Sequence, residues 1–321
     1  MTTNTAPFTV QPRLTQIAMA AKPTGMIADL VCPRIPVDGE KFVYSKLTTA
    51  EMFTIPDARI GRSSDPNQVE FGATDVTDST EDFALEDFVP QKDIDNARQA
   101  NNYDPQAIAA EATAMLLDLA REQRVANLFF TKANYNASLA TTLNGTGQWS
   151  DFTNSDPYQA IMAAFDGMII RPNVAVLGRL TATKLRSHPK IVAGVAAASN
   201  VGVAASAAGK VSLQALADYL ELDAIYVGEP FSNTAAKGQT PTYARLWGKH
   251  ASFLRIDRNI RSVRGMAMPT FAFTAEWNNR FVATAVQTRG IKGGVAIRVG
   301  EQVKELIAFQ DAGYMFENAV A

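Results

Sequence analysis

Few residues of this chain have the types and spacing that catalysis requires. Two histidines, His188 and His250, and one cysteine, Cys32, are its entire set of imidazole and thiol groups. His188 precedes Pro189 at the expected end of a helix, so we interpret it, and His250 in the same way, as a capping or surface residue. Cys32 lies in a short apolar segment and is interpreted as a small buried hydrophobe. One cysteine forms neither an intramolecular disulfide nor a cysteine-rich zinc site.

The remaining candidate motifs also favour structural roles. The sequence contains no phosphate-binding G-x-x-x-x-G-K-[ST] loop, no G-x-G-x-x-G and no G-x-S-x-G. The glycine cluster at 290–294 lies between expected strands and predicts a hairpin turn. The carboxylate pairs Glu81–Asp82 and Glu86–Asp87 match no calcium loop and predict a solvated or partner-facing acidic strip. We therefore expect no catalytic, cofactor-binding or metal-binding residues, and a protein that is not an enzyme.

Composition and charge exclude further classes of protein. The chain has 321 residues, of which 47% are hydrophobic, and its 30 Lys and Arg against 32 Asp and Glu give a net charge of -2. This balance argues against a protein that coats nucleic acid. The first residues do not form a secretory signal, and no apolar run reaches the ~18 residues of a membrane span. We expect a soluble protein made in a cytoplasm.

The clearest predicted element is a long helix over about 104–130. Asp104 followed by Pro105 is typical of a helix start, and the helix would be roughly 40 Å long at ~1.5 Å per residue. We expect one apolar face to be buried and one charged face to be exposed. The predicted apolar face comprises Ile108, Ala112, Met115, Leu116, Leu119, Ala126 and Phe129, and the predicted charged face comprises Glu111, Asp118, Arg121, Glu122 and Arg124.

Ahead of this helix, residues 1–38 resemble an arm more than a core. Leu14, Ile17 and Ala18 predict a short amphipathic helix, and a second apolar segment ends near Pro33. Such an arm is expected to pack on something else, either the rest of this chain or another subunit. Residues 39–60 predict a hairpin, with alternating Phe42, Tyr44 and Leu47 followed by Met52, Phe53 and Ile55.

Elements after the long helix alternate between helices and strands. Asp156-Pro157 and Ser212 predict helix starts, and 174–177 and 224–227 predict buried strands. A helix is expected over about 181–187. Residues 193–211, rich in Ala, Val and Gly, predict a loop. The last part of the chain predicts strands within 271–309, two of them near 291–299 and 305–309.

Charge is unevenly distributed along the chain. Residues 75–95 contain eight carboxylates and one lysine, which we interpret as a long, loosely patterned loop that contacts a partner. Residues 245–304 contain eleven basic residues. Opposite charges in separate segments predict contacts between copies of the chain.

The order of segments resembles one known family. MIADLVCPRIPVDGEKFVYSK is similar to an arm leading into an extended loop, DPQAIAAEATAMLLDLAREQRVANLFF to a spine helix, NVAVLGRLTATKLRSHPKIV to the entry of an axial domain, and DAGYMFENAVA to a family C-terminus. Together they resemble the major capsid proteins of tailed bacteriophages with the Hong Kong 97 fold.

This resemblance implies an α+β fold with five parts. They are an N-terminal arm (1–38), an extended loop (39–85), a peripheral domain (86–160) with the spine helix at about 104–130, an axial domain (161–265) and return strands of the peripheral domain (266–321). Lys41 and Lys46 lie where some relatives form crosslinks, but we interpret both as ordinary surface lysines.

The resemblance also implies a function. The chain would self-assemble, as hexamers and pentamers, into the icosahedral capsid that encloses packaged double-stranded DNA, in a virion assembled in the host cytoplasm. Because few residues precede the arm, a separate scaffolding protein is expected, together with a portal and without a membrane.

Other readings remain open from the sequence. An encapsulin-type nanocompartment shell would share the fold, and neighbouring genes would separate it from a phage capsid. An α/β enzyme with a site around Asp156–His188 would need a converging polar pocket. A tail or baseplate component would not form closed shells.

Overall fold

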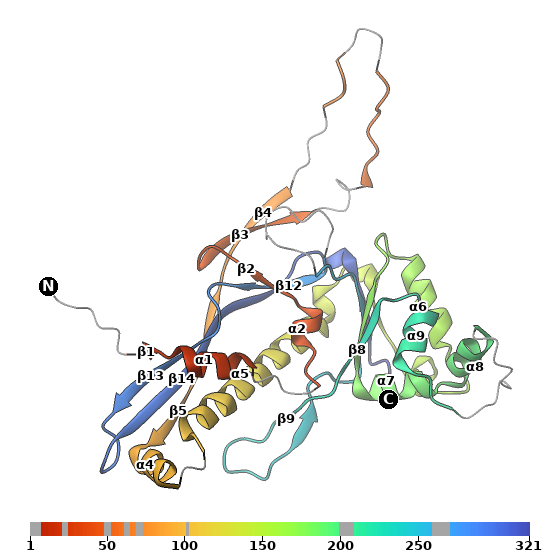
Figure 1. Cartoon of the computed structure of the whole chain (residues 1–321). Helices are drawn as coiled ribbons and strands as arrows, with labels where there is room; N and C mark the ends of the chain where they lie inside the picture. Colours follow the sequence, from red (N-terminus) through yellow and green to blue (C-terminus); the bar gives the residue numbers. More distant parts are fainter. Residues whose placement is uncertain are drawn as a thin grey trace.

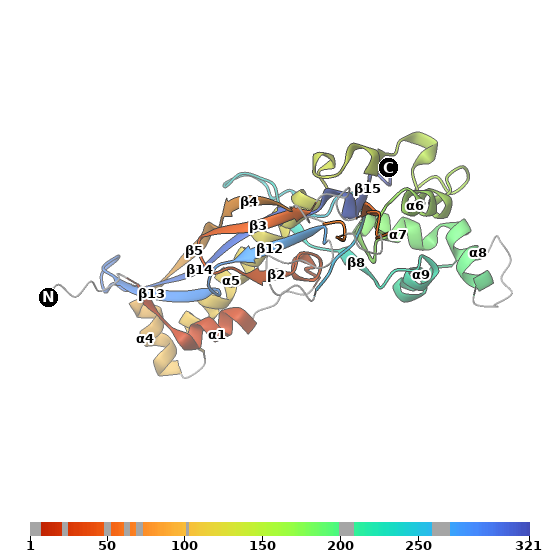
Figure 2. The same ribbon diagram turned by 90° about the horizontal axis from the view of Figure 1, so that it is seen from above.

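A computed structural model of the protein describes residues 8–20, 25–47, 53–60, 65–68, 73–100, 103–198, 209–258 and 270–321. The chain is elongated, with a sheet-based lobe at one end, a helix-flanked sheet at the other and a projection, which includes residues 53–60 and 65–68, that stands away from both (Figures 1 and 2). The expected α+β fold class is confirmed. Within the described ranges, no helix has the length and apolar character needed to cross a membrane.

The first lobe contains a six-stranded sheet built around one long strand, β14. This strand pairs antiparallel with β13 and β12 along one edge and with β5 along the other. β1 adds to β13, and β2 adds in parallel to β12. Segments from the start and the end of the chain therefore share one sheet. The strands are β1 (Thr9–Val10), β2 (Arg34–Pro36), β5 (Glu81–Pro90), β12 (Ala272–Glu276), β13 (Phe281–Gln287) and β14 (Gly294–Ile307).

The long helix α5 (Pro105–Phe129) lies on one side of this sheet, with α1 (Pro12–Ala20) beside it and α4 (Gln91–Ala100) near its start (Figure 2). The predicted start is confirmed, because Oδ1 of Asp104 accepts hydrogen bonds from the amides of Gln106, at 3.0 Å, and Ala107, at 3.3 Å.

The second lobe is a five-stranded sheet in the order β6-β15-β11-β7-β8, flanked by four helices. The predicted starts at Asp156 and Ser212 are confirmed, since each side chain accepts a hydrogen bond from a first-turn amide. The elements are β6 (Ala140–Thr142), β7 (Val174–Gly178), β8 (Ala224–Gly228), β11 (Ala251–Leu254), β15 (Gly313–Glu317), α6 (Pro157–Asp166), α7 (Arg179–Ser187), α8 (Pro189–Ala198) and α9 (Leu213–Tyr219).

Two ribbons and several short elements complete the described chain. The ribbons are β3 (Lys41–Leu47) with β4 (Ala73–Ser79), and β9 (Phe231–Asn233) with β10 (Tyr243–Arg245). The short elements are α2 (Ala28–Val31) and the 3-10 turns η1 (Lys132–Asn134), η2 (Ala137–Leu139), η3 (Gly145–Gly147) and η4 (Gln310–Ala312).

The predicted burial of α5 is wrong over most of its length. The buried face comprises Ala109, Ala110, Thr113, Ala114, Leu117, Arg121, Glu122, Val125, Ala126 and Phe129. Ile108, Met115 and Leu116 are 53%, 42% and 59% exposed. Alanines allow the helix to lie close to β5 and β14, while Asp29 pairs with Arg121 and neutral N–H donors satisfy Glu122. The distribution of polar residues along α5 therefore predicted the wrong face of the helix as the buried one.

The predicted hairpin within 39–60 is also wrong. The alternation is real, since Phe42 and Tyr44 are buried, but β3 pairs with β4, from Lys41 opposite Ser79 to Leu47 opposite Ala73. Alternation identifies a strand and its inner face without identifying the partner strand. Met52 lies outside the described residues.

The acidic segment 75–95 is not a loose loop. It forms the end of β4, the strand β5 and the start of α4. Three of its acidic side chains reach β14: Glu86 contacts Arg298 at 2.7 Å, Glu81 contacts Lys304 at 2.5 Å, and Asp82 accepts from Gln302 at 2.8 Å. For these residues the predicted charge complementarity between copies lies instead within one chain.

Smaller differences between the prediction and the structure concern where elements begin and end. Residues 193–198 continue helix α8 where a loop was expected, and 199–208 lie outside the described residues. One 14-residue strand, β14, replaces the two strands expected near 291–299 and 305–309, and the predicted glycine turn precedes it. The arm packs on its own chain, because Val31, Cys32 and Ile35 are fully buried.

Close packing of β8 against Trp247 gives the first testable prediction. A Cβ atom added to Gly228, at the end of β8, would lie 2.0 Å from Cγ of the buried Trp247. We expect Gly228→Ala to lower the free energy of unfolding by about 1–3 kcal/mol, because the core cannot accept the extra methyl group. Urea unfolding of the purified chain measures this change.

Gly147→Ala is the matched control, because a Cβ at Gly147 meets nothing within 4 Å. We expect its unfolding midpoint to stay close to that of the wild type. Equal midpoints for Gly228→Ala and the wild type would contradict the packing described here.

Candidate intersubunit surface and the charge network behind it

The chain between β3 and β4, which includes the described residues 53–60 and 65–68, projects far from both lobes (Figure 1). The ribbon of β3 and β4 forms the base of this projection. At its base Phe42 and Tyr44 pack on the sheet, with the rings of Tyr44 and Phe273 6.0 Å apart. Beyond the base, all described residues from 53 to 60 are exposed. Phe53, Ile55 and Ile60 are 52%, 93% and 52% exposed. Apolar side chains on a projection, away from their own core, are typical of an interaction surface.

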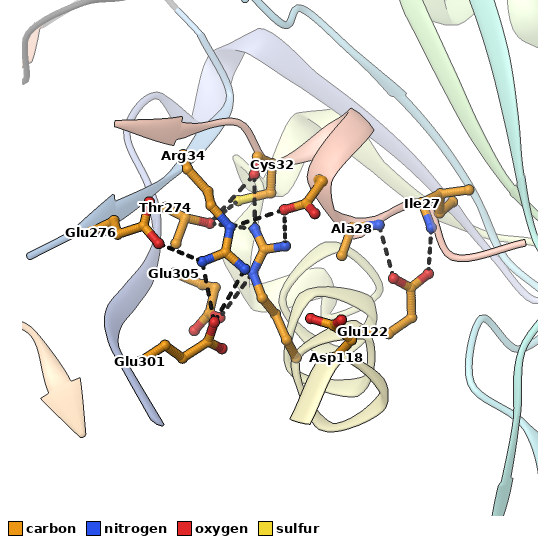
Figure 3. A network of polar contacts seen from close by, with 12 residues as sticks. Ile27, Ala28, Cys32, Arg34, Asp118, Glu122, Thr274, Glu276, Glu301 and Glu305 are labelled. Atoms are coloured by element: carbon orange, nitrogen blue, oxygen red, sulfur yellow. Dashed lines mark hydrogen bonds and ion pairs between the residues drawn. The ribbon is translucent and has the colours of Figure 1, made fainter. Parts of the chain in front are cut away.

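Behind the ribbon, a buried charge network joins β2, α5, β12 and β14 (Figure 3). Its most buried member is Glu301 on β14, whose side chain has no exposed surface. Arg34 on β2 contacts Glu301 at 3.2 Å and Glu276 on β12 at 2.7 Å. Arg280 contacts Glu301 at 3.0 Å and also pairs with Asp118 on α5.

Arg121 on α5 forms a second set of contacts in the same network. It pairs with Asp29, and it donates to the carbonyl oxygen of Cys32 at 3.2 Å and to the hydroxyl of Thr274 at 3.1 Å. On the next turn of the helix, Arg124 donates to Glu305 at 2.9 Å. The N-terminal segment is thus fixed to the long helix and to the sheet.

The electrostatic effect of the network is clearest at Glu301. Burial alone would raise the pKa of this carboxyl, but the guanidinium groups of Arg34 and Arg280 hold the pKa below its ordinary value. The same balance, with Arg121 and Arg34 as partners, lowers the pKa of Asp29. Both carboxylates are therefore charged and paired at neutral pH.

Glu122 fixes the N-terminal segment from the neighbouring side of α5. Its carboxylate accepts from the amides of Ile27, at 2.8 Å, and Ala28, at 2.9 Å, and from Nε1 of Trp247, at 2.6 Å. Three donors satisfy a carboxylate that is only 1% exposed. Burial raises its pKa. One side chain therefore connects the N-terminal segment, the long helix and the second lobe.

The residues first considered for chemistry have packing roles. His188 caps the end of α7 as predicted, but the surface position is wrong: the ring is fully buried, with Nε2 3.1 Å from Oγ of Ser155. His250 is half-buried, and its Nδ1 accepts from the amide of Asn318 at 3.1 Å. Cys32 is buried as predicted. Asp156 contacts Lys190 at 3.2 Å.

The acidic pairs and loop lysines show no converging arrangement. Glu81, Asp82 and Glu86 contact side chains of β14, as described above, and Lys41 and Lys46 are exposed. Across the described ranges, no group of three or more His, Cys, Asp or Glu side chains is placed to hold a metal ion.

The buried arginines were not predicted to form a network. A signal was present in Arg121 and Glu122, which occupy the turn of α5 between Leu117 and Val125, both buried. Two charged residues between apolar positions of one helix face indicate buried charges with partners elsewhere in the fold, and this pattern could have identified the face that packs.

The chain has similar proteins among known sequences and known structures. No family profile matches the chain. The major capsid protein of Pseudomonas phage JBD67 is 47% identical over 317 residues, which cover 98% of this chain and 99% of that protein. A phage-related protein from Bordetella bronchiseptica RB50 has a similar structure, with a TM-score of 0.73 at 20% identity over 98% of both chains. The capsid of cyanophage P-SCSP1u gives a TM-score of 0.54 at 11% identity, covering 89% of this chain and 86% of the other.

The likeness to the cyanophage capsid, at 11% identity, is one of fold. On its 47% identity over nearly the full length, the chain belongs to the family of phage major capsid proteins. It is a structural component of the virion capsid, which confirms the family resemblance inferred from the order of segments.

The network gives the second prediction. Glu301→Gln keeps the shape of the side chain but leaves buried guanidinium groups without their shared anion, so we expect the free energy of unfolding at pH 7 to fall by about 3–5 kcal/mol. A lowered carboxyl pKa stabilises the fold above the unfolded value of about 4.3, and this stabilisation is lost as pH falls through the folded value. The difference between variant and wild type should therefore shrink in acid.

Urea unfolding at pH 7, 5 and 3 measures both effects. Glu81→Gln is the matched control, because Glu81 forms an exposed pair with Lys304 and should cost less than about 1 kcal/mol. Equal losses for the two variants, or a difference that grows in acid, would show that Glu301 has no special role.

Proposed function

We propose that copies of this chain assemble as hexamers and pentamers into a closed icosahedral shell around packaged double-stranded DNA of a tailed phage. In this shell the projection beyond the ribbon of β3 and β4 lies across an adjacent subunit. The observation that carries the proposal is the exposure of Phe53, Ile55 and Ile60 on a projection with no core of its own. Burial of such side chains on neighbours stabilises closed symmetric assemblies.

The segments divide accordingly. Residues 1–38 are the arm, 39–85 the extended loop, 86–160 and 266–321 the peripheral domain, and 161–265 the axial domain. The described part of the arm packs inward, so its contact with neighbours comes from its outer side, where Met19 and Leu30 are 49% and 42% exposed.

Two further partners follow from this function. A separate scaffolding protein directs the curvature of the shell, and a portal occupies one vertex. The role of the chain is structural and needs no cofactor. Support comes from His188, His250 and Cys32, whose described contacts are those of packing groups.

The ribbon gives the third prediction. We expect the triple variant Phe53→Ser, Ile55→Ser and Ile60→Ser to fold but to form no closed shells, because the projection loses the apolar surface that a neighbour buries. Negative-stain microscopy of the full chain, coexpressed with the gene upstream of it, measures shell formation. An unchanged urea midpoint shows that the lobes remain folded.

Ile55→Val is the matched control, since it keeps an apolar side chain at the same position and should retain shells. Normal shells from the triple serine variant would contradict the proposed contact. Wild-type shells that hold a folded enzyme instead of DNA would contradict the proposed contents.

The charge balance gives the fourth prediction. A net charge of -2 offers little counterion release, which is the main source of affinity for duplex DNA. We expect no complex of the unassembled chain with double-stranded DNA in a gel-shift assay at physiological salt. Tight binding that weakens steeply with added salt would overturn this expectation.

A further inference from the structure

A groove separates helix α4 from the turn that joins β13 to β14, at the end of the sheet-based lobe that lies away from the second lobe (Figure 1). Its volume is about 840 Å³. Phe88 of β5 contributes to its apolar lining, and Ile291 of the turn has a fully exposed side chain at its border. An isoleucine exposed beside an apolar hollow is typical of a surface that binds a partner.

Backbone contacts hold the two walls of the groove in place. The amide of Gln91, the first residue of α4, donates to the carbonyl oxygen of Gly293 at 3.0 Å. Ile94 fixes the next turn of α4, because its side chain is buried in the lobe. Gly293 has a positive φ of 70°, and a Cβ there would lie 2.8 Å from the carbonyl oxygen of Gln287. The groove is therefore formed before any partner binds.

Four basic side chains surround this apolar lining. Lys92 and Arg98 come from α4, and Arg289 and Lys292 come from the turn. All four residues are exposed, and none forms an ion pair with a described residue. Asp95 also lines the groove, where its Oδ1 accepts from Nε2 of Gln91 at 2.9 Å. Four positive charges against one carboxylate give the groove a net positive charge.

The basic border and the apolar lining together favour one kind of partner. Carboxylates that flank an apolar side chain would meet the basic border and the apolar lining together. Duplex DNA would match the basic residues, but its phosphates would leave Ile291 exposed. The acidic segment of a second copy is poorly suited, because Glu81, Asp82 and Glu86 already contact β14 of their own chain.

We propose that the groove between α4 and the β13–β14 turn binds a short acidic segment, with an apolar side chain among its carboxylates, supplied by a different polypeptide. This contact goes beyond the shell contacts between copies, because it uses another surface and another partner. It gives the chain a docking site for an accessory protein of the shell.

Three synthetic peptides of about 12 residues, up to ~40 Å long when extended, test the proposal. The first combines glutamate with leucine, the second has lysine in place of glutamate, and the third has serine in place of leucine. Fluorescence anisotropy with the full unassembled chain measures binding. We expect the first peptide to bind at least about tenfold more tightly than either of the others, and its affinity to fall as salt rises.

Variants of the full chain separate this site from nonspecific adhesion. Lys292→Glu should weaken binding of the first peptide about tenfold, whereas Lys237→Glu, an equal change of charge at an exposed position between β9 and β10, should leave it unchanged. Ile291→Ser should also weaken binding, and Leu180→Ser, at a 45% exposed position on α7, should not. Unchanged urea midpoints establish that each variant is folded.

Equal binding of the three peptides would overturn the proposal, as would equal effects of Lys292→Glu and Lys237→Glu. Displacement of the first peptide by a short DNA duplex at physiological salt would identify nucleic acid as the occupant instead. A change of oligomeric state in Ile291→Ser without a change in peptide binding would identify a second copy. Loss of shells in the ribbon variants does not bear on these results, so the two proposals can fail separately.

Discussion

One buried carboxylate, Glu301, holds the sheet-based lobe together. Arg34 reaches it from the N-terminal segment and Arg280 from the residue before β13, while Arg124 of the long helix lies 3.6 Å away. Removing these charges from water is costly, so they remain buried only while each keeps its partner. The result is a fixed geometry among segments that are far apart in sequence.

This constraint separates the parts of the chain that satisfy their own side chains from the parts that leave apolar side chains exposed. The two lobes satisfy most of their own charges and apolar side chains, and Glu122 joins them through Trp247 and the amides of Ile27 and Ala28. The ribbon beyond its base, the outer face of α5 and the border of the groove beside α4 keep apolar side chains exposed. A rigid body with exposed apolar surfaces suits a subunit of a shell, because partners can bury these surfaces without reshaping the body.

Local signals in the sequence predicted much of the fold. Asp104 and Ser212 begin helices because their side chains accept backbone amides, and the alternation of Phe42 and Tyr44 gives a strand with the correct inner face. Long-range choices were not predictable in this way. The partner of β3 lies beyond the expected hairpin, and burial of Arg121 and Glu122 against distant partners reverses the polarity pattern of α5.

The candidate surface also depends on long-range pairing that local sequence signals do not reveal. Exposure of Ile55 depends on the long separation between β3 and its partner β4, because the chain between these strands, with residues 53–60, projects from the lobes (Figure 1). The acidic segment was expected to meet another copy, yet Glu86 meets Arg298 of the same chain. Charge that is complementary in sequence does not reveal whether two segments meet within a chain or between chains.

The lobes fold independently of other copies, whereas burial of the projection depends on them. Hydrogen–deuterium exchange of the unassembled chain and of assembled shells tests this difference most directly. We expect amides of β5 and β14 to be protected in both states, and amides of residues 53–60 to be protected only in shells. Rapid exchange of 53–60 in shells, or protection of β14 only after assembly, would contradict the account.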